Sequence, residues 1–181
     1  MAQIGLKYLK YSPLENGQVT VAKILGKAIK FKPTPKVASG SLSADDRIVE
    51  EYDEIIGGDI EAEVDDVSVE TYAEIFGHNY DATSKVLTRN ANDVPIHIRV
   101  GRIITKINSG VKSYKVEILN DVVLKETELP EEQTKGDSIT FTTRNLKGSF
   151  YVQDDGEWSM FKYFTDLAEA ETYLDSCLAS K

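Results

Sequence analysis

The strictest pattern in the sequence lies in residues 59–65, where acidic and apolar residues alternate. A strand with this period presents one apolar face and one charged face, because successive side chains point to opposite sides. The apolar members are Ile60, Ala62 and Val64, and the acidic members are Asp59, Glu61, Glu63 and Asp65. The sequence therefore predicts a strand that covers a core with one face and exposes a row of carboxylates on the other.

This strand is predicted to be the second half of a hairpin. Residues 47–56 favour the partner strand, and the intervening Gly57 and Gly58 supply the positive φ angles that tight hairpin turns require. Carboxylates of the partner strand, such as Glu50 and Glu54, are then expected to join the acidic row.

Acidity is concentrated around this hairpin. The 181-residue chain has a net charge of −9, whereas residues 45–74 hold thirteen carboxylates and one arginine, a net charge of −12. Proteins bind nucleic-acid backbones with clustered lysine and arginine, so this region is excluded as a phosphate-binding surface. A solvated exterior surface is the simpler alternative for such a run of charges.

Most of the remaining chain also favours strands. Residues 18–32 are rich in β-branched side chains, and Pro33 and Pro35 are predicted to end that strand. The next residues, to about 46, contain proline, glycine and serine with little to bury, and predict a long loop. Further strands are predicted over residues 96–107, 113–125, 138–143 and 148–153, with turns at 108–110 and 155–156.

Two helices are expected beside the strands. The first has an apolar stripe at helical spacing in residues 69–76, with Asp66 or Ser68 as N-cap and Gly77 as its end. The second covers residues 165–178, with Thr165 or Asp166 as N-cap. Its apolar side carries Leu167, Ala170, Leu174, Cys177 and Leu178. The predicted class is mainly β with flanking α-helices, in a single domain over residues 1–181.

The sequence contains no familiar catalytic or nucleotide-binding motif. GxGxxG, GxxxxGK, GxSxG and HExxH are all absent. A single cysteine, Cys177, cannot form an intramolecular disulfide, and with His78 and His97 it is too small a set for structural zinc. Both histidines are expected at a surface or interface. We therefore expect a protein that is not an enzyme and has no cofactor or metal, and no apolar run is long enough for a membrane helix.

Four stretches, taken in order, resemble one family. They are GLKYLKYSPL, the acidic segment GSLSADDRIVEEYDEIIGGDIEAEVDDVSVETYAEIFGHNYD, the run VPIHIRVG and the block ETELPEEQTKGDSITFTTRNLKG. Their order places an acidic hairpin before a short helix that ends in Ile75-Phe76-Gly77, followed by a TKGDSITF strand. By these stretches the chain resembles the major tail proteins, which build the tail tube of long, non-contractile-tailed bacteriophages (siphophages).

The resemblance implies a β-sandwich or barrel-like pair of sheets flanked by a helix, similar to the tube proteins of contractile tails and of type VI secretion. Such subunits form hexameric rings that stack into a tube through which DNA passes during ejection. It also implies tape-measure, tail terminator and distal tail proteins as partners. The protein would be made in the host bacterial cytoplasm and located in the virion tail, without membrane contact. We expect no C-terminal immunoglobulin-like domain.

The resemblance also gives roles to two sets of residues. A carboxylate-lined lumen would repel DNA weakly and let it slide, because a basic wall would hold the phosphates. The expected lumen residues are Glu50, Glu54, Asp59, Glu61, Glu63 and Asp65. The single domain is expected to have an N-terminal arm (about 1–17) and a long assembly loop (about 32–46). Contacts with neighbouring subunits are expected from Pro33, Pro35, Val37, Ser41 and Leu42.

Two other classes of protein remain as alternatives. One is an acidic DNA mimic or another non-enzymatic binding protein, which would carry its charges over a convex surface at phosphate-like spacing. The other is a hydrolase with paired carboxylates, which would need polar groups that converge in a pocket. Acidic residues at every second position of a strand form a flat row, and this spacing disfavours a pocket.

Overall fold

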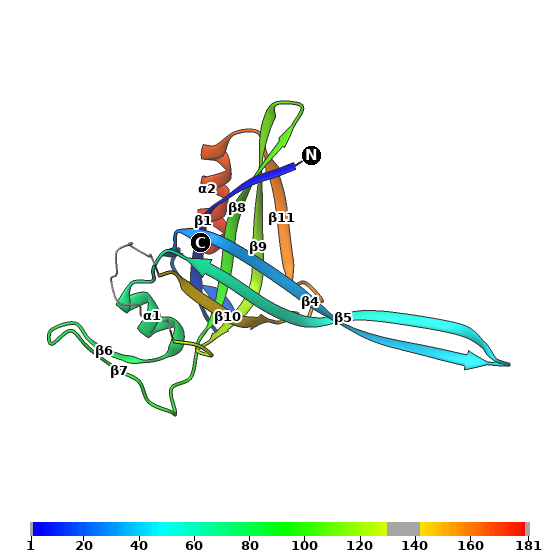
Figure 1. The fold of residues 1–181 in the computed structure, drawn as a ribbon, viewed down its shortest axis with the longest axis horizontal. Coiled ribbons are helices and arrows are strands. Elements are labelled where there is room, and N and C mark those ends of the chain that lie inside the picture. The colour runs from blue at the N-terminus through cyan, green and yellow to red at the C-terminus, as the bar shows by residue number, and fades with distance from the viewer. Residues whose placement is uncertain (1, 130–141, 180–181) are drawn as a thin grey trace, which may run out of the picture.

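The computed structural model describes residues 2–129 and 142–179, which are mainly β with two short helices (Figure 1). The strands are β1 (Ala2–Glu15), β2 (Gln18–Val19), β3 (Lys23–Gly26), β4 (Ala28–Ala44), β5 (Arg47–Val64), β6 (Asn79–Asp81), β7 (Val86–Thr88), β8 (His97–Asn108), β9 (Val111–Lys125), β10 (Arg144–Phe150) and β11 (Ser159–Phe164). The helices are α1 (Val69–Phe76) and α2 (Leu167–Leu178).

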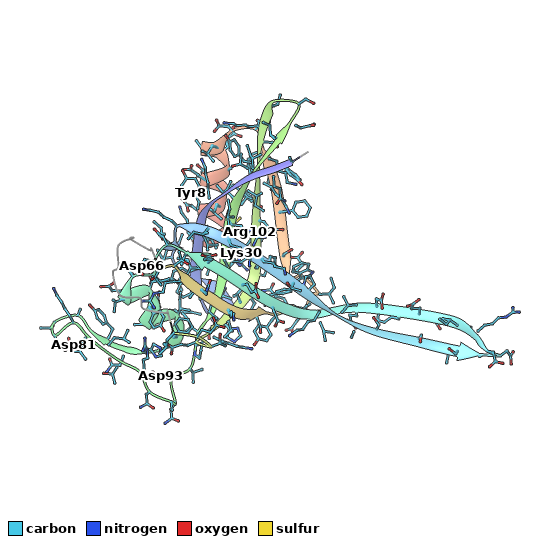
Figure 2. The ribbon with its side chains drawn as sticks, viewed as in Figure 1. Tyr8, Lys30, Asp66, Asp81, Asp93 and Arg102 are labelled. Carbon is cyan, nitrogen blue, oxygen red and sulfur yellow. The ribbon has the colours of Figure 1, made fainter. Side chains whose placement is uncertain are left out.

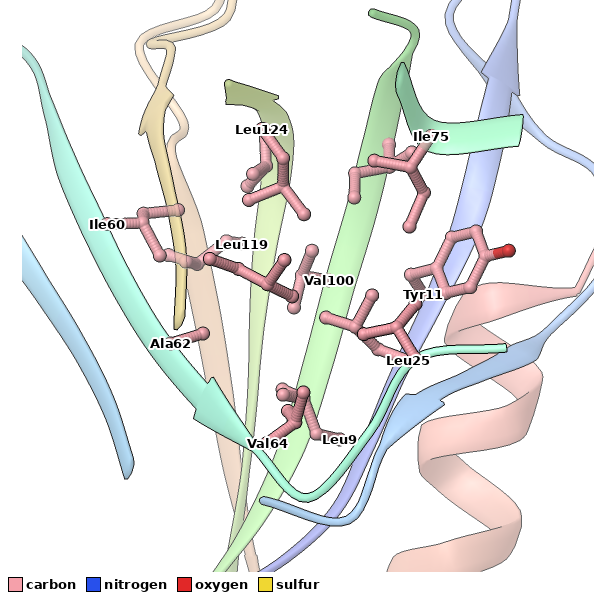
Figure 3. Packing of buried hydrophobic residues seen from close by; sticks show 14 of the residues in the cluster. Leu9, Tyr11, Leu25, Ile60, Ala62, Val64, Ile75, Val100, Leu119 and Leu124 are labelled. Atoms are coloured by element: carbon pink, nitrogen blue, oxygen red, sulfur yellow. The ribbon is translucent and has the colours of Figure 1, made fainter. Parts of the chain in front are cut away.

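One antiparallel sheet dominates the molecule. Counted over the described residues it has nine strands, with a main path β2-β1-β8-β9-β10-β5-β4, while β3 pairs with β1 and β11 pairs with β9. The sheet curls, so that β5 lies across a shared core from β1 and β8 (Figure 3). Strands β6 and β7 form a separate small hairpin beside α1 (Figure 1).

Two apolar clusters hold the sheet and helices together. The larger lies inside the curl and takes side chains from β1, β3, β5, β8, β9, β10 and α1 (Figure 3). The smaller lies on the other side of β8 and β9, under α2, where Leu174 and Leu178 are completely buried. Gly101 permits this close packing, because a Cβ at that position would lie 2.4 Å from Leu174 Cδ1.

The alternation in residues 59–65 has the predicted orientation. Ile60, Ala62 and Val64 are buried in the larger core, while Asp59 and Glu61 on the opposite face are exposed. Local sequence pattern and tertiary packing agree here, since a period of two places every second side chain on the buried face.

The hairpin that contains this stretch turns at a different place from the one predicted. Strands β4 and β5 pair along nearly their whole length, and the turn between them is made by Asp45 and Asp46, with φ of 50° and 60°. Aspartate tolerates this left-handed conformation better than most residues. The prediction of a turn at Gly57 and Gly58 is therefore wrong, and the segments on either side of them are one continuous strand.

The two glycines are explained by packing and not by a turn. A Cβ at Gly58 would lie 2.3 Å from the ring of Phe150 on β10 and 2.4 Å from the carbonyl oxygen of Thr34 on β4. Gly57 has φ of 136° at a point where the pairing with β4 shifts register. Glycine is needed where backbones approach closely or bulge, and these needs resemble a turn signal in the sequence.

The predicted loop at about 32–46 is a strand in the structure. β4 continues through Pro33 and Pro35, although both prolines were predicted to end a strand. Among the described residues β4 pairs only with β5, so its other edge is free. Proline is compatible with an edge strand, because the missing N–H can face away from the partner. The single strand predicted over residues 18–32 is instead divided among β2, β3 and the start of β4.

The expected N-terminal arm is also part of the sheet. β1 pairs with β2, β3 and β8, and its Leu9 and Tyr11 side chains are completely buried. Residues 2–15 are therefore a strand of the sheet and not a separate arm. Leu9 and Tyr11 anchor this strand in the core, whereas Ile4, nearer the N-terminus, is exposed.

Both helices agree with the prediction. The Ser68 side chain accepts a hydrogen bond from the Thr71 backbone N–H, and Gly77 ends α1 with φ of 72°. Asp166 caps α2 by accepting from the Glu169 N–H. Strands β8 and β9 also confirm the prediction within a few residues, while β10 begins earlier than predicted. Most of the strand predicted over 138–143 lies outside the described residues.

Candidate functional site

The predicted acidic row lies on the outer face of β5. Asp59, Glu61 and Glu63 alternate with core side chains, and this places all three carboxylates on the side of the sheet away from the core. The strand pairing shows what surrounds them. β4 lies along one side of β5 and β10 along the other, and residues directly opposite in an antiparallel pair share a face.

Lysines from these neighbouring strands compensate the row. Lys36 of β4 donates a hydrogen bond of 2.7 Å to Asp59, and Lys30 Nζ lies 3.5 Å from Glu61 Oε2 (Figure 2 labels Lys30). Lys147 of β10 stands directly opposite Glu61. The face is thus a mixed-charge surface in place of the bare carboxylate row that was expected.

Glu63 and Asp65 are also used within the chain. Glu63 accepts a hydrogen bond of 2.7 Å from the Thr143 hydroxyl. Asp65, just beyond the end of β5, accepts hydrogen bonds of 2.8 Å from the backbone N–H groups of Lys27 and Asp66. The hydrogen bond from Lys27 is the largest cause of a lowered pKa at Asp65, and that from Asp66 is the next. Asp65 therefore stabilises the chain path at the end of β5.

Glu50 and Glu54 lie on the same strand as the row, not on a partner strand as predicted. In a regular strand they would face away from Asp59. The pairing with β4 shifts between Lys36↔Gly57 and Val37↔Ile55, which leaves one additional residue on β5. An additional residue reverses the alternation, so Glu50 and Glu54 share the ribbon face that carries Asp59. Neither has an ion pair among the described residues.

The outer part of the β4–β5 hairpin, which we call the distal hairpin (residues 37–56), extends far beyond the body of the molecule (Figure 1). Every one of its residues is exposed, and its side chains project on both sides with nothing packed on them (Figure 2). It carries six carboxylates and one arginine. Its exposed large apolar residues are Val37, Leu42, Ile48, Val49, Tyr52, Ile55 and Ile56.

The residues expected to contact neighbouring subunits lie along β4. Pro33 and Pro35 are at its body end, opposite Ile60 and Gly58. Val37, Ser41 and Leu42 are all exposed on the distal hairpin. The structure thus collects the expected contact residues and the acidic residues on one two-stranded ribbon.

His78 is not a surface residue, so that part of the expectation for the two histidines is wrong. Its side chain is 5% exposed, with Nδ1 2.7 Å from Asp93 Oδ2 and Nε2 3.2 Å from Glu126 Oε2. Arg89 also pairs with Glu126, at 3.2 Å. The hydrogen bond from His78 lowers the pKa of Asp93. The cluster joins the end of α1 to the end of β9, and its two carboxylates contact different ring nitrogens. By contrast, His97 is exposed, and it contacts Asp121.

Metal-binding groups and membrane-spanning helices are both absent from the described residues. No group of three histidine, cysteine, aspartate or glutamate side chains there could hold a metal ion. Neither described helix is long and apolar enough to cross a membrane.

No model of a known protein family matches the chain, and no curated protein is significantly similar to it.

The lysines that flank the acidic row were not predicted from the sequence. A signal was available, because Lys27, Lys30, Lys32 and Lys36 recur in the segment before the distal hairpin. The misplaced turn concealed it. With the turn at Asp45 and Asp46, these lysines fall beside the row.

Proposed function

We propose that this chain is a structural subunit of a bacteriophage tail tube that assembles with copies of itself into stacked hexameric rings. The observation that carries the proposal is the distal hairpin. It is long and fully exposed, and it bears seven large apolar side chains that no other described part of the chain covers. Large exposed apolar surfaces mark interaction sites. A strand with a free edge, as β4 has, is also a ready template for pairing with another chain.

The tube function rests on the resemblance of the four sequence stretches. The same resemblance supports the other tail proteins as partners and the location in the virion. A mainly β subunit with two short helices is compatible with it. The compensated face of β5 changes one part of the proposal. Lysines neutralise Asp59 and Glu61 within the subunit, so the carboxylates that repel DNA in the lumen would be Glu50 and Glu54, which form no ion pair with the residues that the structure describes.

The second candidate is an acidic binding protein that mimics DNA. The charge of the distal hairpin favours it, with six carboxylates and one arginine. The apolar residues between these charges disfavour it, because a phosphate-like surface does not need Ile48, Tyr52 or Ile56 exposed.

Self-association distinguishes the two candidates. The test compares the full chain with a variant in which residues 38–54 are replaced by Asn-Gly, which joins the paired residues Val37 and Ile55 through a favourable tight turn. We expect the full chain to form large assemblies in sedimentation velocity experiments and the shortened chain to remain a folded monomer. A full chain that stays monomeric at every concentration, yet binds a DNA-binding protein, would favour the mimic.

A further inference from the structure

A second surface also lacks a cover among residues 2–129 and 142–179. We call it the basic aromatic face, and its residues are Arg102 and Lys106 of β8, Lys115 of β9, and Phe161 and Tyr163 of β11. Phe161 is 58% and Tyr163 48% exposed. The lysines lie against these rings, with Lys115 Nζ 4.4 Å from the Phe161 ring centroid and Lys106 Nζ 5.0 Å from that of Tyr163.

Strand alternation separates this face from the side that α2 covers. Val116 and Ile118 of β9 pack under α2, so Lys115 between them points to the opposite side. Met160 and Phe164 of β11 also pack against the α2 cluster, and this leaves the odd-numbered residues of β11 uncovered. The same strands are therefore buried on one face and open on the other.

The basic aromatic face contains more positive than negative charge. Glu117 lies between Arg102 and Lys115 and bonds to both, at 2.8 Å for Lys115. One carboxylate thus serves two cations, and Lys106 adds a third. The Arg102 side chain is 6% exposed and stacks 4.1 Å from the Phe31 ring centroid (Figure 2 labels Arg102). A hollow of about 420 Å³ opens beside Arg102, lined also by Leu6 and Ile104. Partly buried cations in excess favour an anionic partner.

The distal hairpin has the complementary chemistry. On the ribbon face opposite to Glu50 and Glu54, it carries Glu51 and Asp53 beside Ile55. Small serines stand across the ribbon from both acidic residues, at Ser41 and Ser39, so this face can approach another surface closely. Within one chain the two surfaces do not meet, because the hairpin extends away from β8, β9 and β11 (Figure 1).

We propose that the basic aromatic face receives the Glu51 and Asp53 side of the distal hairpin of a second copy of this chain. The inference rests on the proposed self-assembly and adds the surface that receives the hairpin. Carboxylates of the hairpin face Lys106 and Lys115, and Ile55 covers the exposed rings. The two surfaces lie at different places on the subunit, so the contact is heterologous, and repeating it generates a ring or a filament instead of a closed dimer.

Two variants of the full chain test the contact. The face variant, Lys106→Glu with Phe161→Ser, keeps its hairpin intact. The hairpin variant, Glu51→Lys with Asp53→Lys, keeps its face intact. Each alone is expected to self-associate at least about tenfold more weakly than the unmodified chain, with an unchanged circular dichroism spectrum. Mixed together, they are expected to form a one-to-one complex, because one intact hairpin then meets one intact face. Glu50→Lys with Glu54→Lys is the matched control and should associate normally.

The outcomes separate this contact from the tube. If the unmodified chain forms rings and the face variant also forms them normally, the contact is overturned and the tube stands. If the mixed variants form the complex but the unmodified chain gives only open oligomers, the contact stands and the tube falls. No complex in the mixture overturns the contact. A binding assay with labelled single-stranded DNA tests another occupant of the basic aromatic face, because basic and aromatic side chains also bind single-stranded DNA. The contact is overturned if Lys106→Glu with Phe161→Ser abolishes DNA binding without weakening self-association.

Discussion

Lys36 on β4 donates a 2.7 Å hydrogen bond to Asp59 on β5, across the two strands of the hairpin. This pair and the neighbouring contact of Lys30 with Glu61 show that lysines of the partner strand balance two carboxylates of the acidic row. Exposed ion pairs of this kind contribute little to stability, between about 0 and 1 kcal/mol. Their main consequence is electrostatic, because the outer face of β5 presents both signs of charge.

Reversing one charge of this row is expected to lower stability, because it creates a contact between like charges. Glu61→Lys places a lysine directly opposite Lys32 and Lys147. Like charges directly opposite in a sheet are unfavourable, and we expect the free energy of unfolding to fall by about 1 kcal/mol in urea titrations at low salt. Added salt should reduce the loss. The control is Glu51→Lys, which faces Ser41 and should leave stability unchanged. Equal stability of the two variants would show that the row is electrostatically independent of its neighbours.

Truncation of Leu174 measures the attachment of α2 to the sheet. The side chain is completely buried against β8 and β9, so Leu174→Ala should lower the free energy of unfolding by roughly 2–5 kcal/mol. Denaturant unfolding followed by circular dichroism gives the value. A loss below about 1 kcal/mol would mean that the helix is not packed as described.

Gly101 and Leu174 should be energetically coupled. A Cβ at Gly101 would lie 2.4 Å from Leu174 Cδ1, so Gly101→Ala alone is expected to cost roughly 1–3 kcal/mol through overpacking. In the double variant with Leu174→Ala, the closest contact of that Cβ is removed, and only Ile118 Cδ1, at 2.8 Å, still crowds the new methyl group. The combined loss should then be smaller than the sum of the two single losses. Simple additivity in the double-mutant cycle would contradict the close approach.

Acid should remove the contribution of Asp65. Backbone N–H groups of Lys27 and Asp66 hold its pKa below the usual value in the folded chain. A lowered folded pKa stabilises the fold at pH values above the unfolded pKa, near 3.9, and this contribution disappears as the pH falls through the folded pKa. The stability difference between the unmodified chain and Asp65→Ala should therefore narrow from pH 6 towards about pH 3. A difference that is constant across this range would show that the ionised carboxylate is not the stabilising form.

Sequence patterns predicted those elements whose signals are local. The alternation in residues 59–65 and the capped helices depend on spacing of a few residues, and the structure agrees with both. The hairpin turn was misplaced because Gly57-Gly58 is a stronger local signal than Asp45-Asp46. Glycine at position 58 meets a packing requirement instead, because the Phe150 ring, from a strand far away in the sequence, leaves no space for a Cβ there.

The candidate site was only partly predictable for the same reason. The acidic residues were found, but their grouping on one ribbon face depends on a register shift that no local pattern shows. The burial of His78 between Asp93 and Glu126 likewise joins residues from three separate parts of the chain. Long-range pairing of this kind has no signature in a single sequence.

Electron microscopy of the concentrated, purified chain tests the central claim most directly. The account predicts hollow tubes or rings with six-fold symmetry in negative stain, and their absence when residues 38–54 are replaced by Asn-Gly. Separate, uniform particles at every concentration, identical for the full and shortened chains, would contradict it.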